Sequence, residues 1–128
     1  MPKGRCECGA VAFQIDGDLK PPTACHCSQC RRLSGHIWAG AWANTADIRF
    51  SRDDGLKWYS SSDWAERGFC KECGSSLFYR LKGEDHRMSV AVGCLDNPTG
   101  LTLGRHIYVK DKGDYYEISD DLPQLETY

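Results

Sequence analysis

The sequence lacks a long apolar run, an apolar leader and an excess of basic charge. None of its apolar runs approaches the roughly 18 residues that a membrane helix needs, so we expect no membrane segment. The N-terminus reaches a cysteine motif at Cys6 without an apolar signal segment, and we therefore expect a cytoplasmic protein. The formal charge is −2 and the basic residues are scattered, which argues against a nucleic-acid partner.

Length and hydrophobic periodicity predict one all-β domain that spans residues 1–128. Period-two alternation of apolar residues predicts short strands at 11–16, 77–80, 88–92 and 106–109. Turn signals at 16–18, 53–55, 82–84 and 97–100 separate them, as in an antiparallel sandwich or a partly closed barrel. We expect no long helix, a single helical turn after Cys30, and a solvated acidic segment at 117–121.

Cysteine is the residue that stands out, with eight in the chain. Seven of them form three clusters: Cys6-x-Cys8, Cys25-x-Cys27-x-x-Cys30 and Cys70-x-x-Cys73. A C-x-C pair on an extended segment places both sulfurs on one face, and a C-x-x-C turn brings two sulfurs to one point. In a reducing compartment such clusters indicate metal or redox chemistry rather than a disulfide framework. Three clusters together favour zinc.

Seven clustered ligands predict two zinc ions, one in a closed four-sulfur site and one in a three-sulfur site. Structural zinc has four protein ligands, whereas catalytic zinc keeps three and leaves a position for water or substrate. Spacing alone does not say which clusters share a metal. The simplest interpretation joins the two pairs and leaves the triplet open, although a histidine could fill the fourth position there.

Four stretches resemble the glutathione-dependent formaldehyde-activating enzyme family, which is often grouped with centromere protein V. They are residues 4–11 (GRCECGAV), 25–35 (CHCSQCRRLSG), 69–77 (FCKECGSSL) and 92–98 (VGCLDNP). Order, spacing and flanking residues agree over nearly the whole chain. The resemblance implies the all-β, Mss4-like zinc fold of this family, and a carbon–sulfur lyase activity that joins formaldehyde to the thiol of glutathione.

The resemblance also implies a role for each cysteine cluster. It implies a structural zinc on Cys6, Cys8, Cys70 and Cys73, and a catalytic zinc on Cys25, Cys27 and Cys30. Cys94 stands where the family more often has serine or threonine, and is interpreted either as a small core residue or as a spare thiol near the metal. The chain is also shorter than members linked to glutathione chemistry, which leaves the physiological substrate open. The oligomeric state is not predicted from the sequence.

A zinc ion held by three thiolates is a weak generator of hydroxide but can bind a substrate thiol as thiolate. We therefore expect a small-molecule substrate made of a thiol and an aldehyde. Arg31, Arg32 and His36 follow the triplet, and Arg32 and His36 are the predicted helpers, through charge and proton relay. The ring of His26 is expected to point away from the metal.

Trp38 and Trp42 are expected either to wall a pocket beside the triplet or to pack in the core. Two other function classes stay open: a zinc hydrolase acting on C=N or related bonds, and a non-catalytic zinc module that binds another molecule. Zinc deaminases carry H-x-E and P-C-x-x-C motifs. Neither motif occurs in this sequence, which excludes that kind of hydrolase.

Overall fold

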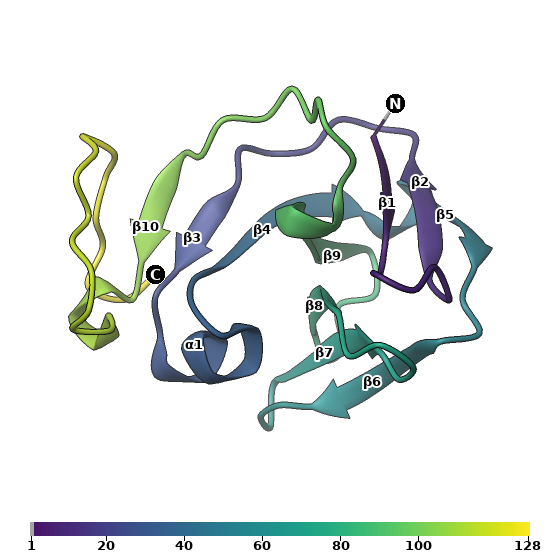
Figure 1. Ribbon diagram of the computed structural model, residues 1–128, viewed down its shortest axis with the longest axis horizontal. Coiled ribbons are helices and arrows are strands. Elements are labelled where there is room, and N and C mark those ends of the chain that lie inside the picture. The colour runs from purple at the N-terminus through teal and green to yellow at the C-terminus, as the bar shows by residue number, and fades with distance from the viewer. Residues whose placement is uncertain (1) are drawn as a thin grey trace.

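The computed structural model describes residues 2–128 and consists mainly of strands in two sheets (Figure 1). The smaller sheet has the order β1-β2-β5, with strands Lys3–Arg5, Ala12–Ile15 and Ile48–Arg52. The larger sheet has the order β10-β3-β4-β9-β8-β7-β6. In chain order its strands are β3 (Thr23–Cys25), β4 (Trp38–Asn44), β6 (Leu56–Ser60), β7 (Ala65–Cys70), β8 (Ser76–Leu81), β9 (Arg87–Ala91) and β10 (Arg105–Ile107).

The apolar core lies between the two sheets. Phe13 on β2 packs against Phe78 on β8 with ring centroids 5.1 Å apart, and Ile15, Leu77 and Val90 are fully buried in the same cluster. β2 buries alternate residues, as its period-two pattern predicts. β9 instead buries Met88 to Ala91 without a break, because it lies between β4 and β8 and is covered on both faces. The all-β fold class predicted from the sequence is thus confirmed.

One strand pair and the only α-helix of residues 2–128 differ from expectation. β10 pairs with β3 in parallel, whereas the sequence suggested antiparallel strands throughout. The strand predicted at 106–109 ends at Ile107, because Tyr108 has a left-handed backbone with φ 56°. The helix α1 (Ser28–Ser34) begins before Cys30 rather than after it, because the Cys27 sulfur accepts a hydrogen bond from the Cys30 N–H and caps its first turn.

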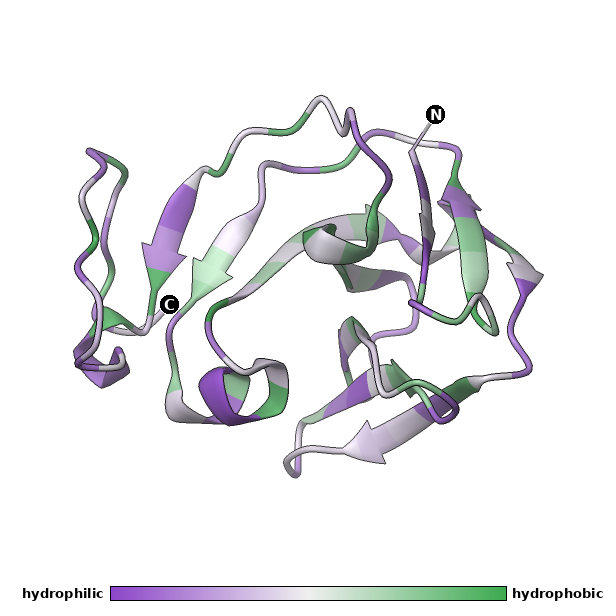
Figure 2. Ribbon diagram, in the orientation of Figure 1, coloured by the Kyte–Doolittle hydropathy of each residue, from purple (hydrophilic) through white to green (hydrophobic). Residues whose placement is uncertain are grey.

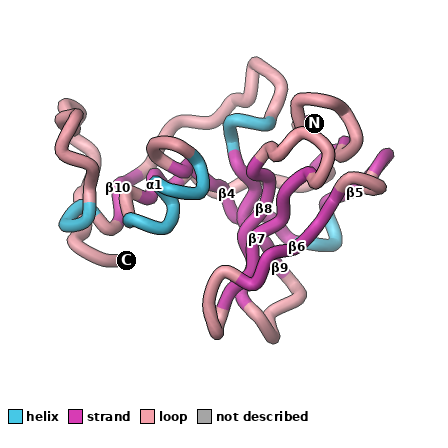
Figure 3. The backbone as a smooth tube through the Cα atoms, turned by 60° about the horizontal axis from the view of Figure 1, so that its bottom comes forward, coloured by secondary structure: helices cyan, strands magenta, loops and turns pink. Residues whose placement is uncertain are grey.

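The remaining helical segments are short 3₁₀ turns at η1 (Thr45–Asp47), η2 (Val92–Cys94) and η3 (Val109–Asp111). Among residues 2–128, no helix is both long and apolar enough to cross a membrane. In Figure 2 the middle of α1 is hydrophilic, and this helix buries Cys30, half-buries Arg31 and exposes Arg32. Figure 3 shows that the chain after β10 is loop apart from one short helix.

The acidic residues Glu117, Asp120 and Asp121 are exposed, as the sequence suggested, but the chain that carries them is anchored to the sheet. The chain that follows them runs along β10 at the edge of the larger sheet (Figure 1), where Gln124 forms an isolated parallel bridge with His106. The Asp120 carboxylate accepts a hydrogen bond from His106, with Oδ2 3.0 Å from Nε2. The C-terminal segment therefore belongs to the folded structure, and one of its acidic residues has a specific partner.

Candidate metal centres and the groove beside them

The first cluster brings together four cysteines from two distant loops. Their sulfurs lie within 4.8 Å of one another and belong to Cys6, Cys8, Cys70 and Cys73. The Cys6 and Cys8 sulfurs are 3.7 Å apart, and the Cys8 and Cys70 sulfurs are 3.8 Å apart. A tetrahedron of sulfurs at a zinc–sulfur distance of about 2.3 Å has edges of about 3.8 Å, so this group fits such an ion. A disulfide would need a separation near 2 Å, and all eight cysteines are free.

Both loops of this cluster close through a glycine with a left-handed backbone. Gly9 has φ 87° and Gly74 has φ 82°, a region that residues with a Cβ rarely adopt. The buried Cys6 sulfur accepts a hydrogen bond from the Val11 N–H at 3.2 Å. The side-chain hydrogen bond from Ser75 lowers the pKa of Cys73 to about 5. These bonds favour the thiolate forms that bind a metal.

The second cluster holds three cysteines at the junction of β3 and α1. Cys25 ends β3, Cys27 caps α1 and Cys30 lies in its first turn, and their sulfurs are within 4.8 Å of one another. Hydrogen bonds from the Cys25 and Cys30 side chains lower the pKa of Cys27 to about 2. Within residues 2–128, this group contains no histidine or carboxylate that could serve as a fourth ligand. The three thiols therefore fit a metal ion that keeps one position for a ligand from outside the chain.

Arg67 is the charged residue that lies against this triplet. It is 7% exposed, and its Nη2 lies 3.4 Å from the Cys30 sulfur and 3.3 Å from Gln29 Oε1. Its guanidinium also lies over the Tyr79 ring, 5.1 Å from the centroid. A buried cation offsets the negative charge of a metal with three thiolates. Arg67 could not be predicted from the sequence, because it is 37 residues from Cys30 and no motif joins the two.

Aromatic side chains surround the triplet on its other sides. Trp38 packs against Cys25 and Cys30, and its indole N–H donates to Ser76 Oγ at 2.9 Å. Tyr79 and Tyr108 contact the same cluster. Trp42 does not belong to it. Its ring lies under Arg87, with the ring centroid 4.2 Å from the guanidinium carbon. Of the two tryptophans considered from the sequence, Trp38 therefore lies beside the triplet and Trp42 packs elsewhere on the sheet.

A groove of about 630 Å³ runs from the four-cysteine loops to α1. It shares Trp38 and Ala91 with the cluster around the triplet. Leu33 and Ile37 add apolar surface, and the polar part of the lining includes Arg5, Glu7, Ser75 and Asp96. This volume lies in the range of small-molecule sites, which are largely apolar with a few polar groups.

Cys94 lines the same groove, but its thiol is not poised as a nucleophile. It is partly buried and donates to the Ala91 carbonyl at 2.9 Å within η2. Burial raises the pKa of the Cys94 thiol to about 12, so it stays protonated near neutral pH. The structure thus places Cys94 as a small packing residue between the two apolar clusters.

The histidines and arginines near the triplet have contacts of their own. The buried His26 ring points away from the cysteines toward Tyr116 and His106. His36 is exposed and its Nδ1 lies 2.7 Å from the Tyr115 hydroxyl. Arg32 is exposed on α1. Arg32 and His36 therefore stay predictions as helpers of the site.

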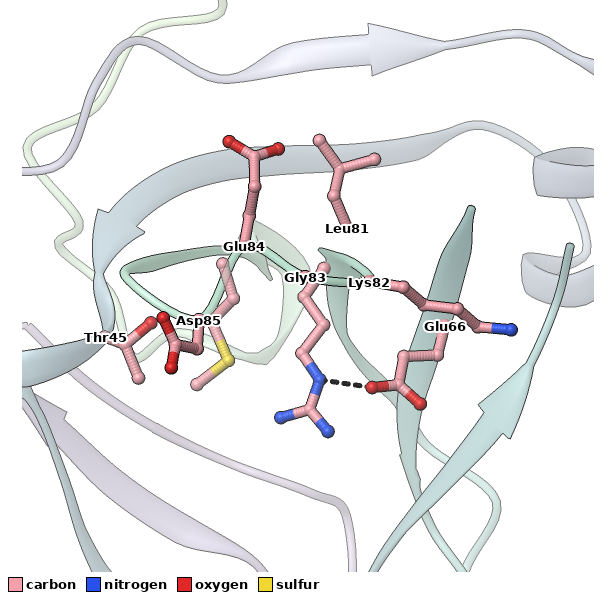
Figure 4. A pocket seen from close by; sticks show the side chains of 9 residues that line it. Thr45, Glu66, Leu81, Lys82, Gly83, Glu84 and Asp85 are labelled. Carbon is pink, nitrogen blue, oxygen red and sulfur yellow. Dashed lines mark hydrogen bonds and ion pairs between the residues drawn. The ribbon is translucent and has the colours of Figure 1, made fainter. Parts of the chain in front are cut away.

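A second hollow of about 310 Å³ lies on a different part of the larger sheet (Figure 4). Its side chains are mostly charged, and Arg80 Nε donates to Glu66 Oε1 at 2.7 Å. None of the eight cysteines lines it. The larger groove is lined by Cys6 and Cys94 and adjoins the triplet through Trp38 and Ala91, so it is the better candidate for a site of chemistry.

The fold and the two clusters define a class: a β protein with one closed four-cysteine metal site and one three-cysteine site beside a groove. Sequence comparison confirms the family. The model of the glutathione-dependent formaldehyde-activating enzyme family matches residues 1–111, and the chain belongs to that family.

The chain is also similar to two other proteins. A protein of Schizosaccharomyces pombe described as an uncharacterized lyase is 25% identical over 122 residues, covering 92% of this chain and 85% of that protein. A crystal structure of a Rhodobacter sphaeroides protein is similar with a TM-score of 0.60 and 26% identity, over 95% of this chain and 98% of that one.

Proposed function

We propose that this protein is a zinc-dependent enzyme of carbon–sulfur lyase type, which joins or splits a formaldehyde-like aldehyde and a glutathione-like thiol. The observation that carries the proposal is the triplet of Cys25, Cys27 and Cys30, with no fourth ligand from residues 2–128. Family membership and the lyase description of the S. pombe relative support the reaction class. The four-cysteine cluster would hold a second, structural zinc.

Zinc bound by the three cysteines would supply a position where a substrate thiol binds as thiolate, the nucleophilic form of sulfur. The chain's own residues supply the rest. Arg67 places a buried positive charge 3.4 Å from the Cys30 sulfur and so stabilises an additional thiolate nearby. Trp38 shields this region and joins it to the groove. An aldehyde held in the part of the groove lined by Trp38 and Ala91 would lie close to the triplet, so that proximity contributes to the rate.

The groove has polar groups suited to a small peptide thiol. Such a thiol carries carboxylates and an ammonium group. Arg5 in the lining could pair with a carboxylate, and Asp96 or Glu7 could pair with the amine. The need for reduced cysteines favours a reducing compartment, for which we propose the cytoplasm.

The experiment is exchange spectroscopy by two-dimensional NMR on formaldehyde, glutathione and their adduct, with zinc-loaded protein. We expect the protein to accelerate exchange between the free and joined species. The control is Cys27→Ser, in which serine retains a side-chain acceptor that can cap α1 while the triplet loses a thiolate.

Equal exchange rates with and without wild-type protein, at two zinc ions per chain, would contradict the glutathione and formaldehyde reaction. Release of an amine from an imine substrate under the same conditions would then favour the hydrolase alternative. Inactivity toward both substrate types would favour a non-catalytic zinc module.

A further inference from the structure

A chain of four hydrogen-bonded side chains runs behind the triplet. The Tyr116 hydroxyl lies 2.5 Å from His26 Nδ1, His26 Nε2 lies 2.8 Å from His106 Nδ1, and His106 Nε2 lies 3.0 Å from Asp120 Oδ2. His26 is 1% exposed and His106 is 4% exposed. All four ring nitrogens of the two histidines therefore have a partner, and neither ring can turn without breaking two hydrogen bonds.

The carboxylate at one end fixes the direction of one hydrogen bond in this chain. The hydrogen bond from His106 lowers the pKa of Asp120, and an ionised carboxylate only accepts, so His106 carries a hydrogen on Nε2 and donates to Asp120. Each of the other two contacts joins groups that can both donate and accept. The chain therefore holds both rings whichever way these two hydrogens point.

Both ends of the chain come from a segment beyond the part that matches the family. The family model ends at residue 111, whereas Tyr116 and Asp120 follow it. Backbone hydrogen bonds hold this segment on β10: the Leu125 N–H donates to His106 O at 2.9 Å, and the His106 N–H donates to Pro123 O at 2.9 Å. In Figure 1 the segment lies along β10, on the far side of β10 from β3. It is therefore a feature of this chain that the family match does not describe.

We propose that Tyr116 and Asp120 are positioning residues for the triplet. They act through His26, which lies between the ligands Cys25 and Cys27 in the sequence. The His26 N–H donates to Ile107 O at 3.0 Å and its ring is held at both nitrogens. On an extended segment, neighbouring side chains point to opposite sides. Holding the His26 ring on one side therefore keeps the Cys25 and Cys27 sulfurs on the other, where they converge on the metal.

The proposal rests on metal binding at the triplet, as does the proposed function, and ¹¹³Cd NMR on cadmium-loaded protein tests it. The wild type should give two resonances, and the four-cysteine site serves as an internal reference. We expect Tyr116→Phe and Asp120→Ala each to weaken cadmium binding at the triplet about tenfold in chelator competition, the usual effect of removing a group just outside the ligands. Binding at the four-cysteine site should stay unchanged.

The matched controls are the neighbours Tyr115→Phe and Asp121→Ala. Tyr115 bonds the exposed His36 rather than His26, and Asp121 is exposed. A second readout is the imidazole ¹⁵N spectrum, in which the signals of His26 and His106 report the hydrogen bonds at their ring nitrogens. Tyr116→Phe should move the His26 signals, which a change elsewhere in the structure would not do.

Three outcomes distinguish the positioning role of Tyr116 and Asp120 from the proposed function. Two cadmium resonances, with triplet affinity in Tyr116→Phe and Asp120→Ala equal to that of the controls, would overturn the positioning role alone. An imidazole ¹⁵N spectrum of His26 that is unchanged in Tyr116→Phe would overturn it as well, whatever the affinities. A wild-type spectrum with one resonance, from the four-cysteine site, would contradict both this role and the proposed function.

Discussion

The two cysteine clusters use the same ligand type but differ in what surrounds them. The four-cysteine cluster is closed by two loops, each turning at a glycine with positive φ, and Cys8 and Cys73 are exposed to solvent. The triplet lies between β3 and α1, with Arg67 and Trp38 packed against it. The groove borders both clusters, because it is lined by Cys6 of the first and by Trp38, which packs with the second. The clusters therefore share a ligand type but differ in ligand number and in neighbouring charge, and we expect a metal ion bound at each to act differently.

The two clusters also join different segments of the chain. The four-cysteine cluster joins the loop after β1 to the loop between β7 and β8, and so connects the two sheets. The triplet joins one strand to the helix that follows it directly. A metal in the first cluster cross-links distant segments, whereas a metal in the second closes a local turn. Loss of the two metals should therefore have different consequences.

The largest effect is expected for the four-cysteine cluster. Cys70→Ser removes a buried ligand at the end of β7 and should lower the free energy of unfolding by at least about 4 kcal/mol, because metal binding there contributes directly to folding. Thermal unfolding and zinc content measure the effect. A Cys70→Ser protein that is as stable as the wild type and retains two zinc ions would contradict a structural role for the four-cysteine cluster.

Cys27→Ser should leave the fold in place and remove the metal of the triplet. Serine can still accept the Cys30 N–H that Cys27 accepts at 3.2 Å, so we expect a stability loss of about 1–2 kcal/mol. Zinc content should fall from two ions to one per chain, and aldehyde–thiol exchange should stop. Exchange at the wild-type rate would show that the triplet is not the reacting centre.

Arg67→Met tests the buried charge beside the triplet. Without the guanidinium, the Cys30 sulfur loses its nearby cation, and we expect zinc affinity at the triplet to fall about tenfold. The matched variant Arg67→Lys keeps the charge but loses the planar fork that lies over Tyr79, and should retain more of the affinity. Chelator competition measures both. A loss confined to the four-cysteine site would contradict the assignment of Arg67 to the triplet.

The smallest effect is expected at Cys94. Cys94→Ser keeps a donor for the Ala91 carbonyl, so aldehyde–thiol exchange should stay within about twofold of the wild type. Because burial raises the pKa of this thiol to about 12, it should react slowly with iodoacetamide at pH 8. Mass spectrometry measures the alkylation. Rapid alkylation together with loss of activity in Cys94→Ser would restore the interpretation of a spare nucleophilic thiol.

Local patterns predicted the parts of this molecule that depend on local geometry. The alternation at 11–16 predicts β2, and the spacings C-x-C and C-x-x-C predict that the sulfurs within each cluster lie close together. Spacing did not predict that Cys6 and Cys8 meet Cys70 and Cys73. The parallel pairing of β10 with β3 had no such signal, because it joins residues about 80 positions apart. Two other contacts also had no signal in the local pattern: Arg67 beside Cys30, and Asp120 beside His106. These contacts depend on strand order, which periodicity does not encode.

Titrating glutathione into the ¹¹³Cd-loaded protein tests most directly whether a substrate thiol binds at the triplet and not at the four-cysteine cluster. Both metal sites are observed in one spectrum, so each serves as the control for the other. We expect the triplet resonance to shift as glutathione is added, while the four-cysteine resonance stays in place. A shift of the four-cysteine resonance alone, or no shift with glutathione, cysteine or 2-mercaptoethanol, would contradict the claim that the triplet is the site where a substrate thiol binds.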